Sequence, residues 1–258
     1  MENTTIVTAL YNISRETNGD GRKWSDYIAW FRETLQLPIP MVIYIAAEDQ
    51  ELVHQINQYR PSNVATKIIF SDIPYSNYQL IFQSIMERTD YKNRIIDPKR
   101  VECVLPMYNV IQYSKFKWLK EIAETNPFES SYIFWMDAGI SRFIPKQTYS
   151  HIKNKIILPQ NKLIIQHNYM LHQYPMNEAY LWDSQCLMCG TMFGGDPEVL
   201  KHFADIIDKE LETRTSLGWI NNEQILLAYL YHTSCKDLFH LIYNNTSKHL
   251  CLFEKIYL

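Results

Sequence analysis

The first half of the chain alternates short apolar segments with longer amphipathic ones, and this alternation restricts the possible folds more than any other feature. Strands are expected at residues 4–12, 41–46 and 66–73, and helices at 24–35, 48–58 and 77–88. The first helix carries an apolar stripe at helical spacing, formed by Trp24, Tyr27, Ile28, Phe31 and Leu35. Strands that are joined through helices predict a largely parallel sheet with helices on both faces.

The second half is less regular, but predicted strands and helices still alternate along it. We expect a polar, irregular segment at 90–108, a helix at about 109–125, and a buried strand that ends at Asp137. Asp196 and Pro197 predict an N-cap and the first position of another helix. Further elements are a strand at 162–169, a loop-rich segment at 170–190, a short strand into Gly194 and Gly195, a helix at 221–232, and closing strands at 237–243 and 249–258. With no repeat or linker, residues 1–258 are predicted to form one α/β domain.

Composition argues against some classes of protein, such as nucleic-acid-binding and transmembrane proteins. The chain has 258 residues, of which 47% are hydrophobic and 21% charged, enough for one large core. The net charge of −3 argues against a nucleic-acid partner. No apolar run approaches the roughly 18–20 residues that a transmembrane helix needs. A start without a signal-peptide pattern and five irregularly spaced cysteines favour a cytoplasmic protein, with the cytoplasmic membrane surface as the alternative location.

Asp137 is the first candidate for chemistry. Open α/β sheets bind ligands outside the carboxyl ends of their strands, and Asp137 follows a buried strand directly. A carboxylate there can hold Mg²⁺ or Mn²⁺, which in turn binds a diphosphate, and Gly139 would let a phosphate or sugar come close. The alternative is that Asp137, Ala138 and Gly139 only form the turn that leaves the strand.

Other candidates are less specific. Glu223 and Gln224 fall in the first turn of a predicted helix, where an acid is also favoured without any function. Lys115 and Lys117 lie on the helix before the Asp137 strand and are either phosphate ligands or solvated side chains. Arg15 follows the first strand, and its planar guanidinium suits phosphate. The chain has neither the G-x-G-x-x-G nor the P-loop motif.

Five segments together resemble the HtrL/YibB family. In chain order they read TIVTALYNISR, PMYNVIQYSKFKWLKEI, YIFWMDAGISRF, CGTMFGGDPEVL and NNEQILLAYL, and the resemblance spans roughly residues 4–250. Members of this family occur near bacterial surface-polysaccharide genes and resemble GT-A glycosyltransferases. The resemblance implies a GT-A-like, Rossmann-type mixed sheet flanked by helices, with a donor half at about 1–145 and an acceptor half at about 146–258.

The resemblance also implies roles for individual residues. Asp137 takes the place of the Asp-x-Asp metal motif, with His249 as a second metal ligand, and the donor site extends over Ala138 and Gly139. Glu223 or Asp183 would be the catalytic carboxylate, within about 3 Å of the acceptor oxygen if the reaction inverts. The nucleotide base and ribose would lie against Thr8, Ala9, Leu10 and Tyr11, and the diphosphate against Arg15, Lys115 and Lys117. The acceptor would contact Arg142, Trp182, Gly194, Gly195 and Gln224.

One departure from the motif bears on the metal. The second acidic position of Asp-x-Asp is Gly139 here, which leaves one carboxylate at the strand end. The first hypothesis is a metal-assisted glycosyltransferase that uses a nucleotide-diphosphate sugar, with UDP as the expected nucleotide and a glycan or other hydroxyl compound as acceptor. The alternative is a catalytically degenerate module of the same fold that binds a glycan or a protein. A metal-dependent phosphohydrolase ranks last, because it needs a cluster of carboxylates.

Overall fold

Seven strands form one mixed sheet in the order β3-β2-β1-β4-β6-β5-β7 in the computed structural model, which describes residues 3–153, 157–244 and 251–258. The strands β3, β2, β1 and β4 run parallel to one another, and β6 is antiparallel to both β4 and β5. At the far edge, β7 runs parallel to β5. The strands are β1 Thr4–Ala9, β2 Met41–Ile45, β3 Thr66–Phe70, β4 Tyr132–Met136, β5 Leu163–His167, β6 Met188–Gly195 and β7 Phe239–Tyr243.

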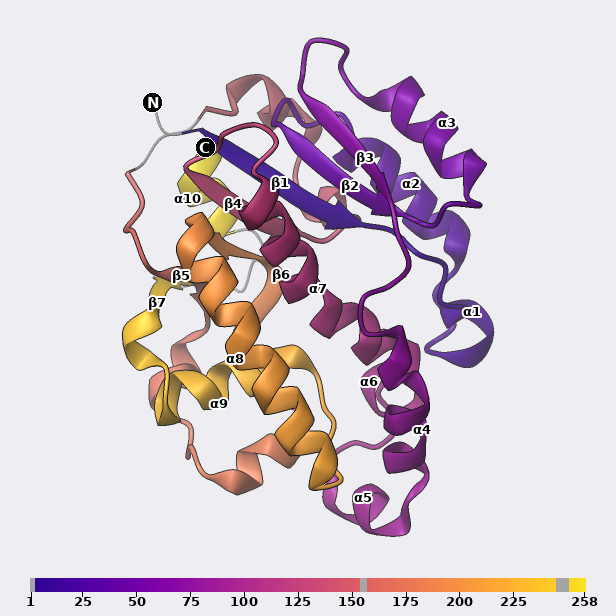
Figure 1. The fold of residues 1–258 in the computed structure, drawn as a ribbon, viewed down its shortest axis with the longest axis vertical. Coiled ribbons are helices and arrows are strands. Elements are labelled where there is room, and N and C mark those ends of the chain that lie inside the picture. Colours follow the sequence, from indigo (N-terminus) through magenta and orange to yellow (C-terminus); the bar gives the residue numbers. More distant parts are fainter. Residues whose placement is uncertain (1–2, 154–156, 245–250) are drawn as a thin grey trace.

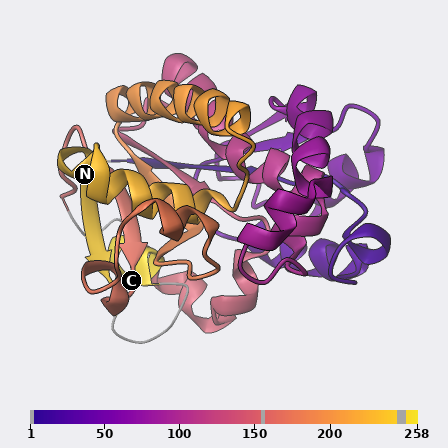
Figure 2. The same cartoon turned by 90° about the horizontal axis from the view of Figure 1, so that it is seen from below.

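Helices cover both faces of the sheet (Figures 1 and 2). The α-helices are α1 Arg15–Asn18, α2 Trp24–Thr34, α3 Gln50–Tyr59, α4 Gln79–Glu87, α5 Thr89–Arg94, α6 Val101–Val104, α7 Pro106–Thr125, α8 Pro197–Ser216, α9 Glu223–Thr233 and α10 Cys251–Tyr257. Short 3-10 turns are η1 Ser76–Tyr78, η2 Ile140–Phe143, η3 Lys146–His151, η4 Tyr169–His172, η5 Glu178–Trp182 and η6 Lys236–Leu238. The predicted α/β fold, a mixed sheet flanked by helices, is therefore confirmed.

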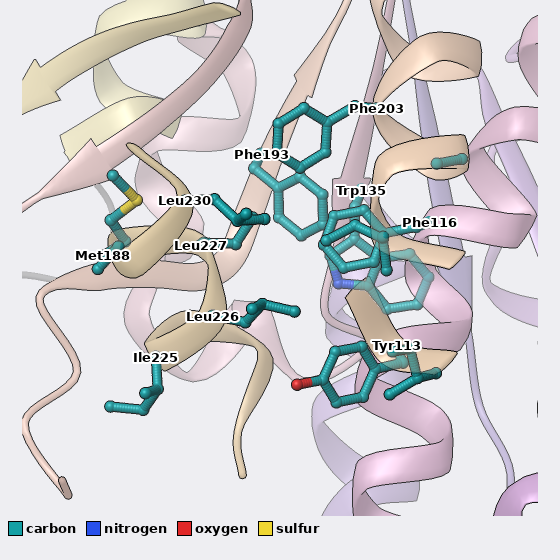
Figure 3. Close-up of a cluster of buried hydrophobic side chains, with 14 of the residues drawn as sticks. Tyr113, Phe116, Trp135, Met188, Phe193, Phe203, Ile225, Leu226, Leu227 and Leu230 are labelled. Atoms are coloured by element: carbon teal, nitrogen blue, oxygen red, sulfur yellow. The ribbon is translucent and has the colours of Figure 1, made fainter. Parts of the chain in front are cut away.

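Two hydrophobic clusters lie on opposite faces of the sheet, because alternate strand residues point to opposite sides. On β4, Ile133 and Trp135 join the cluster beneath α4, α7, α8 and α9, whereas Phe134 joins the one beneath α2, α3 and α10. Figure 3 shows the first cluster, where Leu226 and Leu230 of α9 approach aromatic side chains of α7, β6 and α8. Buried on both faces, the central strands read as continuous apolar runs.

Most predicted elements are present, with some shifted ends. The first strand ends at Ala9, not at residue 12, and the following residues leave the sheet. Asp196 caps α8 as predicted, because its side chain accepts hydrogen bonds from the backbone N–H groups of Glu198 and Val199 at 3.1 and 3.2 Å. The segment 90–108 was predicted to be irregular, but it contains α5, α6 and the start of α7, where Pro106 occupies an N-terminal helical position.

The predicted C-terminal strand at 249–258 is wrong, because Cys251–Tyr257 form α10. Leu252, Phe253, Ile256 and Tyr257 repeat as adjacent pairs four residues apart, which is a helical period and not an alternation. All four side chains are buried in the cluster that covers α2 and α3. The helix therefore completes one face of the core instead of extending the sheet.

Candidate functional site

A pocket of about 290 Å³ opens where the strand connections change direction. From β1 the chain runs outward to β2 and β3, and it returns on the other side of β1 as β4. A crevice outside the carboxyl ends of two such strands is the usual ligand site of open α/β sheets. The pocket walls come from residues 9–17 after β1, residues 137–139 after β4, and side chains near the starts of α2 and α7.

Cationic side chains outnumber acidic ones in this pocket. Its lining includes two acidic residues, Glu16 and Asp137, and four cationic ones, Arg15, Arg22, Lys115 and Arg142. The local balance is positive although the whole chain carries a net charge of −3. A concave surface with this charge attracts an anionic ligand.

The arginines differ in how firmly they are held. Arg15 forms a two-pronged ion pair with Asp20, at 3.0 and 2.6 Å, and donates to the Tyr27 hydroxyl at 2.6 Å. The Arg142 side chain makes no hydrogen bond or ion pair within the described part of the chain, and its guanidinium lies 5.0 Å from the centre of the Trp30 ring. Partial desolvation and the nearby charge of Arg22 lower the pKa of Arg142. The Arg142 guanidinium therefore has hydrogen-bond donors that are free to bind an anion.

Two aromatic residues of the pocket lining, Tyr11 and Trp135, belong to a stack of rings. Trp118 lies between Tyr11 and Trp135 in a continuous stack, with ring centres 5.7 Å apart on each side. The indole N–H of Trp135 donates to Asp137 Oδ1 at 2.8 Å. Because Trp118 is fully buried on α7, the stack fixes the ends of β1 and β4 relative to this helix.

Lys115 lies at the inner end of the pocket, surrounded by oxygen atoms. Its Nζ is 3.0 Å from Glu223 Oε1, 3.0 Å from the Gly190 carbonyl oxygen and 3.3 Å from Asp137 Oδ1. The Lys115 and Glu223 side chains are almost completely buried, whereas Asp137 keeps 34% of its side-chain surface exposed. Three elements far apart in the sequence thus meet at one ammonium group.

Charge pairing keeps this lysine protonated. Burial alone would lower the pKa of Lys115, but Asp137 and Glu223 outweigh it and raise the pKa above its usual value. Burial raises the pKa of Glu223, while Lys115 opposes this shift. Glu223 Oε2 has no hydrogen-bond partner among the described residues, so the salt bridge to Lys115 is the main compensation for burying this carboxylate.

The surroundings of Asp137 Oδ1 do not fit a divalent cation. Asp137 Oδ1 already receives Lys115 and the Trp135 N–H. Two unit charges 4 Å apart repel by about 4 kcal/mol near a protein surface, and a divalent ion beside an ammonium by about twice as much. Within the described ranges, no three His, Cys, Asp or Glu side chains are grouped to hold a metal. The proposed second ligand, His249, lies outside the described residues.

A second, more acidic hollow adjoins the pocket. It shares the loop from Tyr11 to Ser14 and extends over the carboxyl ends of β2 and β3. Its acidic lining residues are Glu48, Asp49, Glu51 and Asp72. The carboxyl edge of the sheet therefore has a cationic half beside β4 and an acidic half beside β2 and β3.

Many of the residues predicted for the donor site lie together in the cationic pocket. The structure places eight of them in its lining, namely Ala9, Leu10, Tyr11, Arg15, Lys115, Asp137, Ala138 and Gly139. Arg142, which was predicted to contact the acceptor, also lies in this lining. Thr8 is different, because it is completely buried within β1 and its hydroxyl has no hydrogen-bond partner among the described residues.

The structure places the other predicted residues that it describes outside this lining. Lys117 forms an ion pair with Asp208 of α8. Asp183 accepts hydrogen bonds from the Tyr174 hydroxyl and from two backbone N–H groups of its own turn. Trp182 is 9% exposed, so it offers little surface to an acceptor.

Glu223 and Gln224 also differ from the prediction. The Glu223 side chain has no exposed surface, so it cannot contact an acceptor directly and instead positions Lys115. Gln224 donates to the side chain of Asn222, the N-cap of α9, at 3.1 Å. The Glu223 side chain therefore pairs with Lys115, and the Gln224 side chain contacts the N-cap of α9.

Gly194 and Gly195 lie at the opposite end of the sheet from Asp137. Gly195 pairs with Ile133 at the start of β4, about 13 Å along the strand from the pocket. A Cβ atom on Gly194 would lie 2.2 Å from the Ile133 carbonyl oxygen, and one on Gly195 would lie 2.5 Å from Val199 Cγ1. These glycines allow close packing and do not form an acceptor wall.

Several pocket residues were not predicted as site residues. Trp24 and Tyr27 appeared only as members of an apolar stripe, yet both line the pocket. Tyr108 falls in a segment that was predicted to be irregular, and its ring centre lies 4.8 Å from the Arg15 guanidinium. Arg22 sits in the loop before α2, where no local pattern marks it.

Gly190 is a further residue with a structural reason to be glycine. A Cβ atom there would lie 2.2 Å from Glu223 Oε1, so Gly190→Ala must displace the carboxylate that holds Lys115. We expect a loss of about 1–3 kcal/mol in the free energy of unfolding, measured by urea denaturation. Gly139→Ala is the control, since its new methyl would only meet Trp30 Cε3 at 3.2 Å. Equal losses in both variants would contradict this role.

Comparisons with known proteins identify a family and a distantly similar solved structure. The sequence model of the family described as "Bacterial protein of unknown function (HtrL_YibB)" matches residues 2–254. No curated protein matches the chain. A crystal structure of mouse xyloside xylosyltransferase 1 in its apo form is similar with a TM-score of 0.43 and 10% identity, covering 93% of this chain and 84% of that one. In the described part of the chain, no helix combines the length and apolar character needed to cross a membrane.

Proposed function

Since the chain belongs to the HtrL/YibB family, we propose that it is a glycosyltransferase that takes a sugar from a nucleoside-diphosphate sugar, with UDP as the nucleotide. The resemblance of this family to GT-A glycosyltransferases supports the proposal. The observation that carries it is the cationic pocket, lined in part by aromatic side chains, at the carboxyl ends of β1 and β4. A hydroxyl group of a glycan or a similar compound is the proposed acceptor.

The charge distribution along the sheet edge supports one orientation of the nucleotide. A diphosphate carries two or more negative charges, which match the half of the edge that contains Arg22 and Arg142. Ribose hydroxyls and base N–H groups are donors, which match the carboxylates beside β2 and β3. Tyr11 borders both hollows, so in the proposed orientation its ring would lie between the nucleoside and the diphosphate.

The chemistry requires stabilisation of a leaving anion. The bond between the anomeric carbon of the sugar and the diphosphate oxygen breaks, and its electron pair stays on that oxygen. The acceptor oxygen forms the new bond to the anomeric carbon and gives its proton to a base. Fixed cations near the departing oxygen lower the barrier because they need no reorganisation as charge develops. The free guanidinium donors of Arg142 are suited to this role.

Binding of UDP tests the proposal. UDP at about 100 times its dissociation constant should stabilise the protein by ~2.7 kcal/mol, which corresponds to a rise of roughly 5–10 °C in the melting temperature. Arg142→Ala should weaken UDP binding about tenfold or more, because a charge-assisted hydrogen bond contributes about 1.5–3 kcal/mol. Arg88→Ala is the control, since Arg88 pairs with Asp90 on the surface and does not line the pocket. No stabilisation by any nucleoside diphosphate would refute the proposal.

A binding module without catalysis is the second candidate. It is favoured by the placement of the two predicted catalytic carboxylates, because Glu223 is buried against Lys115 and Asp183 is held by its own turn. Slow release of free sugar from UDP-sugars discriminates between the two candidates. The glycosyltransferase should hydrolyse at least one donor, and Arg142→Ala should reduce that rate. A protein that binds UDP but hydrolyses no donor fits the module.

A further inference from the structure

We propose that the Lys115 ammonium occupies the position of a divalent cation, so that a nucleotide binds in this pocket without a metal. The part of the inference that concerns the nucleotide rests on the proposed function. The part that concerns Lys115 stands on the geometry around its Nζ atom alone. It differs from the expectation that Asp137 holds Mn²⁺ or Mg²⁺.

The atoms around Lys115 are those that a hard cation would choose. Two carboxylate oxygens, from Asp137 and Glu223, and the carbonyl oxygen of Gly190 lie within 3.3 Å of Nζ. Carboxylate and carbonyl oxygens are the ligands preferred by Mg²⁺ and Mn²⁺. An ammonium group is a compact point charge with three donors, and here each donor has one oxygen within reach.

The surrounding chain is built to hold this arrangement. Gly190 lacks the Cβ atom that would displace the Glu223 carboxylate. The Trp135 N–H holds Asp137 Oδ1, and the Trp135 ring centre lies 5.5 Å from Lys115 Nζ. Lys115 itself comes from the middle of α7, a 20-residue helix that is packed against the sheet. Such a cation cannot dissociate, and it neutralises part of the acidic charge close to the site of the diphosphate.

This placement leaves the arginines to contact the anion. The three Lys115 donors face protein oxygens, so its contribution to the ligand is electrostatic, through compensation of Asp137 and Glu223. Arg142 and Arg22 then supply the hydrogen bonds to the diphosphate. A nucleotide should accordingly bind equally well in EDTA and in Mn²⁺.

Removal of the ammonium should create a metal site. In Lys115→Ala, the three oxygens remain, and the lost side chain leaves room for an ion. Mn²⁺ at about 100 times its dissociation constant should raise the melting temperature of this variant by roughly 5–10 °C, whereas the melting temperature of the wild type should not change. Electron paramagnetic resonance should show bound Mn²⁺ in the variant alone.

Two further variants control this experiment. Lys117→Ala removes a lysine from the same helix that pairs with Asp208 outside the pocket, and it should gain no Mn²⁺ site. Lys115→Ala combined with Glu223→Gln removes one charged ligand and should lose most of the acquired Mn²⁺ affinity. If Lys115→Ala does not fold, a measurement of Mn²⁺ binding to the wild type still tests the inference. Mn²⁺ that binds the wild type and is lost in Asp137→Asn would overturn the inference.

Calorimetric titration with UDP separates failure of this inference from failure of the proposed function. Equal UDP affinity of the wild type in EDTA and in Mn²⁺ supports the metal-free site. UDP binding that disappears in EDTA would overturn the inference while supporting the proposed function. No UDP binding under either condition would refute the proposed function, and the Mn²⁺ experiments with Lys115→Ala would still test the role of the ammonium.

Discussion

Replacement of Lys115 by methionine is expected to lower the free energy of unfolding by about 3–5 kcal/mol, the usual loss when one partner of a buried ion pair is removed. The Glu223 side chain has no exposed surface, and its Oε2 has no hydrogen-bond partner among the described residues. Without the ammonium, the carboxylate would be buried with no compensating charge. Urea denaturation followed by circular dichroism measures the loss.

The matched control is the double variant Lys115→Met with Glu223→Gln. Replacing both members of a buried pair removes the uncompensated charge, so this variant should regain most of the stability lost by Lys115→Met. Lys117→Met should change stability by less than about 1 kcal/mol, because Lys117 and Asp208 form a partly exposed pair. If the double variant were as unstable as Lys115→Met alone, the loss of stability would not come from the uncompensated charge of Glu223.

Trp118→Ala is the second change with a large expected effect. The side chain is completely buried, and its ring lies 5.7 Å from Tyr11, 5.7 Å from Trp135 and 5.5 Å from Tyr44. Removal of a buried tryptophan costs about 3–5 kcal/mol. Because Tyr11 and Trp135 line the pocket, the variant should also bind UDP more weakly. Urea denaturation and calorimetric titration with UDP measure the two effects.

Trp118→Phe is the control for this change. The Trp118 indole N–H has no hydrogen-bond partner among the described residues, so phenylalanine removes ring volume but no hydrogen bond. It should therefore keep most of the stability and most of the UDP affinity. If Trp118→Ala bound UDP as tightly as the wild type, the aromatic stack would have no part in shaping the pocket.

The sequence predicted best the features that depend on local pattern. The strands around Val42, Phe134 and Ile164 are short apolar runs, and residues 24–34 carry a helical stripe, so their type was clear from neighbouring residues. Asp137 was also predicted to lie at the carboxyl edge of the sheet, because its position at a strand end follows from the strand itself. Each of these inferences needed only a window of about ten residues.

The inner part of the site could not be predicted in the same way. Lys115 and Glu223 are 108 residues apart, and no local pattern shows that they form a buried pair. Glu223 follows the N-cap of a helix, where acids are common for a different reason, and the family resemblance led to its prediction as a catalytic carboxylate. Arg22 reaches the pocket from a loop. These features depend on how separate elements pack, which is a tertiary property.

The central claim is that a nucleoside diphosphate binds between the carboxyl ends of β1 and β4, held by side chains and not by a metal at Asp137. Crystals soaked with UDP and Mn²⁺, with data recorded at the manganese absorption edge, test it directly. We predict the diphosphate beside Arg142, with Lys115 still between Asp137 and Glu223 and no manganese bound to Asp137. A manganese ion bound to Asp137, or UDP bound elsewhere on the protein, would contradict it.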